Sequence, residues 1–524
     1  MNMKLKYTIG CLFASAALVS CSDYLNESSG DLLIPEKVDE FQSVLYGEGY
    51  PSSFTTDVEW MDLMTDDVEI SPSNGHPDSD GEEGDDTNSI PAGQGAFCWA
   101  YDIEYYLTSY ARPYENRYKN IMACNTVIEA AETMTGNPAK IDACLAQAHT
   151  LRAFSYFCLV NWYGLPYNSA TADKDMGVVI RLKSEVSRDE PTRSSVAQVY
   201  KQINDDLDKA LEYFETAETS KSLFIVSKKV ALLLKSRVAL YTGQWDDAIT
   251  YGGEIEKEGF NLYNIGALSK EDMENYYTDW IFLTSQNPEI IFTYSDDGSY
   301  SYHSFMEYAH MLKGASFAPS QTNEGDLINS YEEGDHRLYA FFMQDDIDYV
   351  YDDWFEEWYY ENYKVCRNMP FKHYGYASSI QCYSQTFRTA EALLNMAEAY
   401  VQRNSSGDAE KALALLNELR KNRFANDKFV ALTEADFASN AALLQFVRDE
   451  RRRELCFEET HRWNDLRRYG CPRIEHRFYA TSESVPVTYV LEAGDKNYTL
   501  ALPKSETEYN TQIEIYDRRN IEAE

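Results

Sequence analysis

Three stretches of the chain repeat their apolar residues with the 3.6-residue period of packed helices. This period limits the possible folds strongly, because each such stretch needs another element against which to bury its apolar face. We therefore expect a helix in each of the three. The apolar positions are Leu151, Phe154, Cys158 and Trp162; Val230, Leu233, Leu234, Val238 and Tyr241; and Ala390, Leu393, Leu394, Ala397 and Val401.

Two of these stretches run into a turn and a partner helix, as helix-turn-helix repeats of the tetratricopeptide type require. After the second stretch come Gly243, Trp245 and Ala248. The small residue allows two helices to approach, and the aromatic side chain fills the gap between neighbouring repeats. After the third stretch come residues 405–408 and a partner helix. That helix is predicted from Ala412, Leu415, Leu416 and Leu419. We expect degenerate repeats rather than a regular array.

The sequence between the second and third stretches differs in kind. Residues 276–376 hold 15 of the 41 tyrosines, nearly twice the density of the whole chain. Helical periodicity is weak over residues 260–385, which predicts loops and short elements packed on the helices. A second loop is predicted at residues 71–95, which are rich in Gly, Pro, Ser and Asp.

The amino terminus has the profile of a secretory signal, with Lys4 and Lys6 followed by an apolar run over residues 7–19. That run is too short to span a membrane. Residues 18–21, Leu-Val-Ser-Cys, resemble the lipobox of bacterial lipoproteins. We therefore predict a signal peptide at residues 1–20 and lipidation of Cys21, whose two or three acyl chains would anchor the protein stably. The alternative is an ordinary secreted protein with a coincidental cysteine.

The formal net charge of -39 argues against nucleic acid as a partner, because an acidic surface repels phosphate backbones. The sequence contains no GxSxG, HExxH, Walker or GxGxxG motif, and its eight histidines form no metal-binding pair. We predict no catalytic activity, no cofactor and no metal. Residues 78–86 faintly resemble a calcium loop but lack its spacing, so a solvated loop is favoured. A bridge between Cys366 and Cys382 is left open.

The most distinctive string of the chain is rich in arginine and acid and covers residues 448–470. Taken alone, the string predicts a solvated helix with pairing over one turn around Glu450 and Glu454, and with Leu455, Trp463 and Leu466 facing inward. As a string it closely resembles the signature of the SusD/RagB-like outer-membrane lipoproteins. Further blocks agree in the order expected. They are residues 151–166, 287–292, 319–320, 387–399 and 502–506.

The resemblance implies a mostly α-helical single domain over residues 21–524, with about four tetratricopeptide-like units and an irregular, loop-rich ligand-binding portion. The helical scaffold is expected at about residues 110–260 and 385–470, and the loop-rich portions at about 50–110 and 260–385. The family caps TonB-dependent transporters. The resemblance therefore implies a SusC-like transporter as partner and a lipid-anchored position in the outer membrane, facing the cell exterior.

A glycan site needs flat aromatic rings against sugar faces and polar groups for the hydroxyls. An aromatic cluster covers residues 99–114, and family members bring ligand contacts from this segment and from an earlier acid pair. The candidate ligand residues are Asp66, Asp67, Asn74, Trp99, Tyr101, Tyr294, Tyr302 and Trp354, with Tyr300 and Trp358 as further aromatics. For any one ring, burial in the core is the alternative.

These observations favour a non-catalytic lipoprotein that captures oligosaccharide and delivers it to the transporter by acting as a lid. An importer subunit of the same fold that binds peptide is the first alternative, because a tyrosine ring can also hold an extended backbone. A surface glycoside hydrolase is the second alternative. Such an enzyme needs two carboxylates, but with 86 acidic residues in the chain any pair can be imagined.

Overall fold

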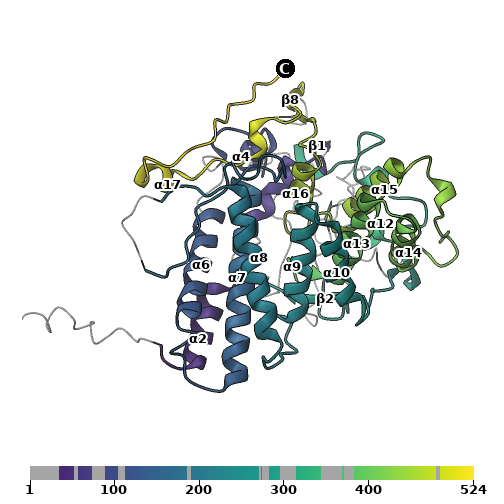
Figure 1. Ribbon diagram of the computed structural model, residues 1–524. Coiled ribbons are helices and arrows are strands. Elements are labelled where there is room, and N and C mark those ends of the chain that lie inside the picture. Colours follow the sequence, from purple (N-terminus) through teal and green to yellow (C-terminus); the bar gives the residue numbers. More distant parts are fainter. Residues whose placement is uncertain are drawn as a thin grey trace, which may run out of the picture.

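The computed structural model describes residues 35–51, 57–73, 89–103, 112–185, 191–270, 273, 282–294, 314–343, 369–370, 383–479 and 484–524. Most of the described secondary structure is helical, and Figure 1 shows α6 to α10 running side by side. The prediction of a mostly α-helical fold is confirmed. The larger helices are α6 (Pro113–Glu129), α7 (Pro138–Tyr163), α8 (Val196–Phe214), α9 (Lys228–Tyr241), α10 (Trp245–Glu256), α13 (Thr389–Arg403), α14 (Asp408–Lys421), α15 (Asn440–Leu455) and α16 (His461–Arg468).

Helix α7 is the central helix of the scaffold. The side chain of Asn137 accepts the backbone N–H of Ala139 at 2.9 Å, and Pro138 occupies the first position, where no N–H is needed. Every residue from Ala143 to Tyr163 is buried. The helix is covered on both flanks because it packs against α6 on one side and α8 on the other.

The remaining scaffold helices pack in chain order. Helix α8 contacts α9, α9 contacts α10, α10 contacts α13, and α13 contacts α14 and α15. The turn between α9 and α10 places Gly243 at φ 72°, in the left-handed region that favours glycine. Ala248 is fully buried, and its carbonyl accepts the hydroxyl of Ser236 at 3.0 Å. The small residue thus permits the close approach of α9 and α10 that the sequence pattern predicted.

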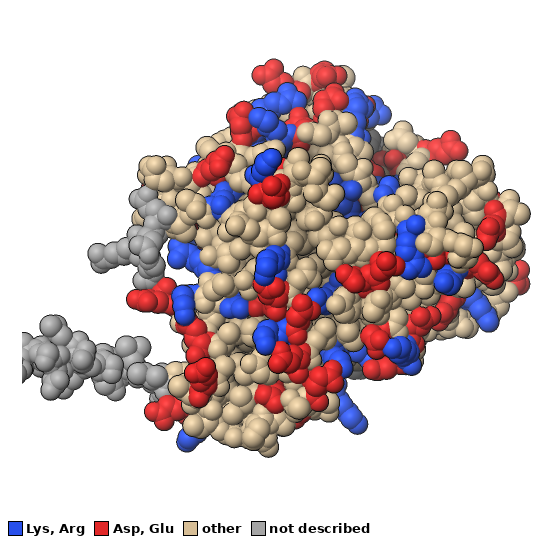
Figure 2. Space-filling model, in the orientation of Figure 1, with Lys and Arg blue, Asp and Glu red and all other residues tan. Residues whose placement is uncertain are grey.

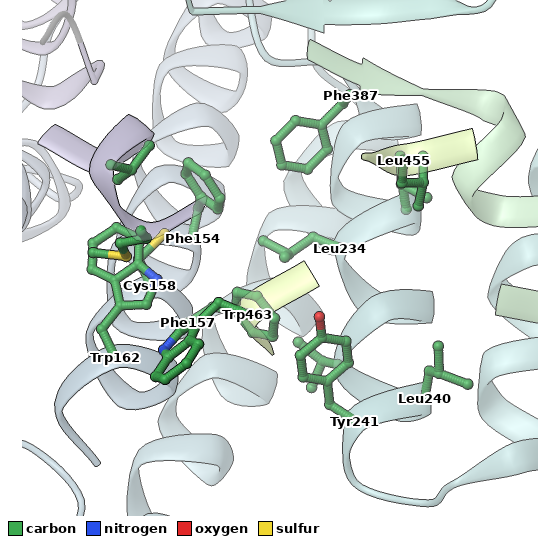
Figure 3. Packing of buried hydrophobic residues seen from close by; sticks show 14 of the residues in the cluster. Phe154, Phe157, Cys158, Trp162, Leu234, Leu240, Tyr241, Phe387, Leu455 and Trp463 are labelled. Atoms are coloured by element: carbon green, nitrogen blue, oxygen red, sulfur yellow. The ribbon is translucent and has the colours of Figure 1, made fainter. Parts of the chain in front are cut away.

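Apolar side chains from distant parts of the chain meet in one core (Figure 3). Helix α7 contributes Phe154, Phe157, Cys158 and Trp162, and α9 contributes Leu234, Leu240 and Tyr241. Phe387 of β6 (Thr386–Arg388), Leu455 of α15 and Trp463 of α16 reach the same core. Six cysteines of the described chain are buried in or beside this core: Cys98, Cys124, Cys144, Cys158, Cys456 and Cys471.

The described strands form small antiparallel pairs. Strand β1 pairs with β3, β2 with β6, β4 with β5, and β7 with β8. The β1–β3 pair runs from Val68 opposite Pro319 to Ser73 opposite Gly314, and so joins the early part of the chain to the middle part. The strands are β1 (Val68–Ser73), β2 (Ile290–Thr293), β3 (Gly314–Pro319), β4 (Phe342–Met343), β5 (Met369–Pro370), β6 (Thr386–Arg388), β7 (Ile474–Phe478) and β8 (Val487–Leu491).

Short helical elements complete the described chain. They are α2 (Val38–Val44), η1 (Leu45–Gly49), η2 (Glu59–Met64), α4 (Ser89–Phe97), η3 (Ile265–Ala267), η4 (Ile328–Ser330), α12 (Arg337–Ala340), η5 (Glu434–Asp436), η6 (Lys496–Tyr498) and α17 (Lys504–Tyr509).

The arginine- and acid-rich string is not the single solvated helix that its charges alone predicted. It forms α15 and α16, separated by a link in which Phe457 and Glu459 have φ values of 57° and 51°. Glu450 and Glu454 are fully buried. Glu450 pairs with Arg453 one turn along α15, as the string predicted, and also with Arg337 of α12. Glu454 pairs with Arg388 of β6. Such cations offset the cost of burying a carboxylate.

Candidate functional site

The predicted acid pair lies between η2 and β1 and is held by arginines of α15 and α16. Asp66 accepts from Nε and Nη2 of Arg462 at 2.7 and 2.6 Å, and Asp67 accepts from Nε of Arg452 at 2.5 Å. The Asp67 side chain is buried, whereas that of Asp66 is 35% exposed. The pair therefore ties the early loop to the two helices of the family string.

The pKa values of these two neighbouring carboxyl groups are shifted in opposite directions. Burial opposes the ionisation of Asp66, but Arg452 and Arg462 outweigh it and hold its pKa well below the ordinary value. Burial is the main cause of the raised pKa of Asp67, and the neighbouring charge of Asp66 adds to it. The charge of Asp66 is thus already matched by arginine.

Trp99 and Tyr294, two of the predicted ligand residues, are core residues in this structure. The Trp99 ring is 0% exposed, donates its N–H to the carbonyl of Met64 at 2.9 Å, and stacks on His476 with ring centroids 4.3 Å apart. Tyr294 is buried beside Phe387. Neither ring presents a face to a ligand, so we do not include them in the proposed site.

The predicted residues Asn74, Tyr302 and Trp354 lie outside the described residues, and so do Tyr300 and Trp358. Cys21 and residues 1–20, the acidic stretch 78–86, and Cys366 with Cys382 also lie outside them.

Tyr101 lies in a groove. Its ring is 43% exposed, and its backbone N–H donates to Oδ1 of Asn520 at 3.2 Å. The groove, which we call the tail groove, has a volume of about 260 Å³ and lies between the early part of the chain, the end of α7 and residues 500–518. Its lining residues are Trp60, Tyr101, Asp102, Ile103, Pro113, Tyr163, Leu500, Ala501, Leu502, Lys504, Thr507, Ile515, Tyr516 and Arg518.

The C-terminal tail, residues 494–524, forms one side of this groove. It lies over the helix ends in the upper part of Figure 1, where α17 is labelled. The N–H of Leu500 donates to the carbonyl of Trp162 at 2.8 Å, and Nδ2 of Asn497 donates to the carbonyl of Trp99 at 2.9 Å. These bonds fix the tail to α7 and to the segment that precedes Tyr101.

The walls of the tail groove combine aromatic rings with polar groups. Trp60 and Tyr163 are buried and form its base, and the Trp60 N–H donates to the carbonyl of Asp57 at 2.7 Å. Tyr101 remains open to solvent. At the rim, Nζ of Lys504 lies 2.5 Å from a carboxylate oxygen of Asp102. The groove therefore offers both ring faces and charged groups, the two kinds of surface on which a sugar can bind.

Arg518 provides a buried positive charge at this groove. The residue is 4% exposed and donates to the carbonyls of Thr499 and Ala100 at 2.9 and 2.8 Å. Among the described residues, no acceptor lies within hydrogen-bond distance of its Nε. Burial lowers the pKa of Arg518 to about 10, so the guanidinium is charged at neutral pH.

The sequence predicted Tyr101, which lines this groove, but pointed to neither Tyr516 nor Arg518 of the tail. Some 400 residues separate the two sides of the groove, and no local pattern connects them. The block at residues 502–506 supported the resemblance and was the only signal that drew attention to the tail.

The described residues contain no group of three or more His, Cys, Asp or Glu side chains placed to hold a metal ion. Within the same part of the chain, none of the helices has the length and apolar character needed to cross a membrane.

Known families match most of the chain. A profile described as "Starch-binding associating with outer membrane" matches residues 24–240, and one described as "SusD family" matches residues 269–521. The chain belongs to the SusD family. The predicted resemblance to this family is confirmed. No curated protein matches the sequence.

Solved structures of SusD superfamily proteins share the fold. One from Bacteroides thetaiotaomicron is 20% identical, with a TM-score of 0.65 over 92% of this chain and 100% of that chain. One from Bacteroides fragilis is 20% identical, with a TM-score of 0.63 over 92% and 100%. A SusD-like carbohydrate-binding protein from Bacteroides vulgatus is also 20% identical, with a TM-score of 0.60 over 91% and 97%.

Proposed function

We propose that this SusD-family protein is a non-catalytic binding protein of the outer membrane that captures oligosaccharide. Family membership supports the proposal, because one matching profile is described as starch-binding and a structural neighbour as carbohydrate-binding. The observation that carries it is the tail groove, where the exposed ring of Tyr101 stands beside the Lys504–Asp102 pair. An exposed ring next to hydroxyl-binding groups suits a sugar better than it suits a reacting centre.

The wider role follows from the resemblance of the sequence to the SusD/RagB-like lipoproteins. We propose that lipid on Cys21 holds the protein at the outer membrane, facing the cell exterior. The protein then acts as a lid on a SusC-like TonB-dependent transporter and delivers the captured ligand to it. Asp66 and Asp67 have a positioning role in this proposal, since their carboxylates hold the early loop on α15 and α16.

Calorimetry on the purified protein tests the binding role. Titration with a panel of oligosaccharides and peptides should show heat with at least one oligosaccharide. Tyr101→Ala should weaken that binding by about 3- to 10-fold, because one aromatic contact contributes roughly 0.5–1.5 kcal/mol. Tyr509→Ala is the matched control, because Tyr509 is 85% exposed on the same tail and does not line the groove.

Three results would contradict the proposal in different ways. Binding of peptides alone would favour the peptide-importing alternative. Shortened sugars in the calorimeter cell, seen by chromatography, would show a hydrolase. Equal affinities of the protein and Tyr101→Ala for the bound sugar would place the site elsewhere.

A further inference from the structure

Three arginines lie together behind one wall of the tail groove, and we call them the arginine cluster: Arg193, Arg467 and Arg518. Backbone carbonyls connect them. Arg193 donates to the carbonyl of Tyr163, and Arg467 donates to the carbonyl of the next residue, Gly164. Arg467 also approaches the hydroxyl of Thr499 at 3.4 Å, and Arg518 donates to the Thr499 carbonyl at 2.9 Å.

In the part of the chain that the structure describes, no carboxylate oxygen lies within ion-pair distance of any of the three guanidinium groups. Their hydrogen-bond acceptors there are carbonyl and hydroxyl oxygens. Glu514 and Asp495 act on Arg193 and Arg518 only through space. A carbonyl acceptor satisfies an N–H group but does not neutralise a charge.

Buried arginines elsewhere in the protein are paired with carboxylates. Arg388 has carboxylate oxygens of Glu289, Glu454 and Glu458 within 2.9 Å. Arg237 is paired with Glu391 and Glu459, each at 2.6 Å. The chain has 86 acidic residues and a net charge of -39, so acids are plentiful. Arg467 and Arg518, the two buried members of the arginine cluster, differ from these paired arginines, because neither has a carboxylate partner among the described residues.

The cluster is joined to the groove by the residues that line it. Arg518 and Tyr163 line the groove directly, and Tyr516, another lining residue, lies within electrostatic range of Asp175 as well as of Arg467 and Arg193. Lys504 and Asp102 at the rim form a neutral pair. Among the described lining residues, Arg518 is the one charged group without an ion-pair partner, so it gives this wall of the groove a positive charge. A buried charge acts strongly on a ligand there, because the surrounding protein screens it less than water does.

We infer that the tail groove selects acidic glycans, whose sugars carry an oxyanion such as a carboxylate or a sulfate. The inference rests on the proposed function and names the class of its ligand. The oxyanion would serve as the counter-charge that the arginine cluster lacks, while the ring of Tyr101 contacts the face of the sugar. A neutral glycan could use the ring but would leave the positive wall uncompensated.

Matched pairs of glycans test this inference on the purified full-length protein. The first pair is polygalacturonate and its carboxyl-reduced form, and the second is dextran sulfate and dextran. Calorimetry should show at least tenfold tighter binding of the charged member in at least one pair. Which pair shows the difference distinguishes carboxylate from sulfate. Raising NaCl from 50 to 500 mM should reduce the difference, because salt screens charges at an open groove.

Variants of the arginine cluster should remove the preference. Arg518→Gln is expected to reduce the ratio of the two affinities several-fold, and Arg518→Lys, which keeps the charge, to retain most of it. Lys504→Gln is a second variant that should fold normally, because the Lys504 side chain is 67% exposed. It too should lower the ratio. Arg473→Gln is the control, because Arg473 is 48% exposed, pairs with Glu475 and does not line the groove.

Each outcome separates this inference from the proposed function. If a neutral glycan binds as tightly as its charged form, and Tyr101→Ala weakens both, the preference for acidic glycans is wrong and the binding role stands. If no glycan of either kind binds, both are wrong. If the charged forms bind more tightly but Arg518→Gln and Lys504→Gln keep the full ratio, the arginine cluster is not the cause.

Discussion

The carboxylate of Glu454 forms ion pairs with three arginines that lie outside α15. Its Oε1 lies 2.9 Å from Nη1 of Arg388 and 2.8 Å from Nη2 of Arg423, and its Oε2 lies 3.3 Å from Nη1 of Arg337. All four side chains are buried. Burial opposes the ionisation of Glu454, but the arginines outweigh it and hold its pKa well below the ordinary value. The carboxylate of Glu454 thus connects α15 to three other parts of the chain.

We expect Glu454→Ala to lower the free energy of unfolding by about 3–5 kcal/mol, because it removes one carboxylate partner from each of three buried arginines. The free energy of urea denaturation measures the change. A lowered carboxyl pKa in the folded state means that the stabilisation is present above the unfolded value of about 4.3 and is lost as the pH falls through the folded value. Glu333→Ala is the control, because Glu333 forms an exposed pair with Lys428. Equal losses for both variants would contradict this account.

Glu459 provides a pH dependence of the opposite sign. It shares Arg237 with Glu391, so that one guanidinium faces two carboxylates. Burial, with the charge of Glu391, raises the pKa of Glu459 to about 7. The folded protein therefore holds a proton that the unfolded chain has released, and stability falls as the pH rises from about 4.5 through 7.

The side-chain amide of Glu459→Gln does not titrate in this pH range. The stability of this variant relative to the unmodified protein should therefore improve between pH 5 and pH 8. Urea denaturation midpoints at several pH values measure the trend. Glu434→Gln is the control, because the side chain of Glu434 is exposed. If both variants follow the unmodified protein at every pH, Glu459 is ionised throughout and the prediction is wrong.

At the scale of elements, the packing of α10 on α13 depends on one of two adjacent glycines. A Cβ atom built on Gly252 would lie 2.4 Å from Cγ of Met396, a buried residue of α13. A Cβ atom on Gly253 would meet nothing within 4 Å. The two neighbours therefore differ only in whether they face the partner helix.

We expect Gly252→Ala to destabilise the protein by about 1–3 kcal/mol, because Met396 must move within a packed core. Gly253→Ala should stabilise it by about 0.5–1 kcal/mol, because alanine loses less backbone entropy in a helix. Unfolding free energies of the two variants measure the difference. Destabilisation by Gly253→Ala, or a neutral Gly252→Ala, would show that α10 packs otherwise.

The elements also show which features the sequence could predict. The periodic stretches became α7, α9 and α13, because an apolar stripe reports burial within its own helix. Nothing local reveals that Glu454 meets Arg388 and Arg337, which lie 66 and 117 positions away. The same holds for Trp99 and Tyr101. Trp99 is 0% exposed, because its ring bonds to the carbonyl of Met64 and stacks on His476 of β7, whereas Tyr101, two positions on, is 43% exposed at the groove.

At the scale of the whole molecule, the helical scaffold carries the groove at one end. Figure 2 shows the face of the molecule that is seen in Figure 1. Acidic and basic side chains are interspersed over it, with wide uncharged areas between them. The tail groove is built from the early part of the chain, the end of α7 and the C-terminal tail. Binding there joins both ends of the sequence, so a ligand would hold the tail against the scaffold.

The position of the molecule at the membrane depends on the predicted lipid at Cys21. In cells, Cys21→Ser should move the protein from the outer-membrane fraction to the soluble fraction, because the acyl chains supply the anchor. Cys11→Ser is the matched control, because Cys11 lies within the predicted signal peptide and should leave the location unchanged. Mass spectrometry of the processed amino terminus should find acyl chains on Cys21. A free thiol there, in a protein that still sediments with the membrane, would show that another part of the chain holds it in place.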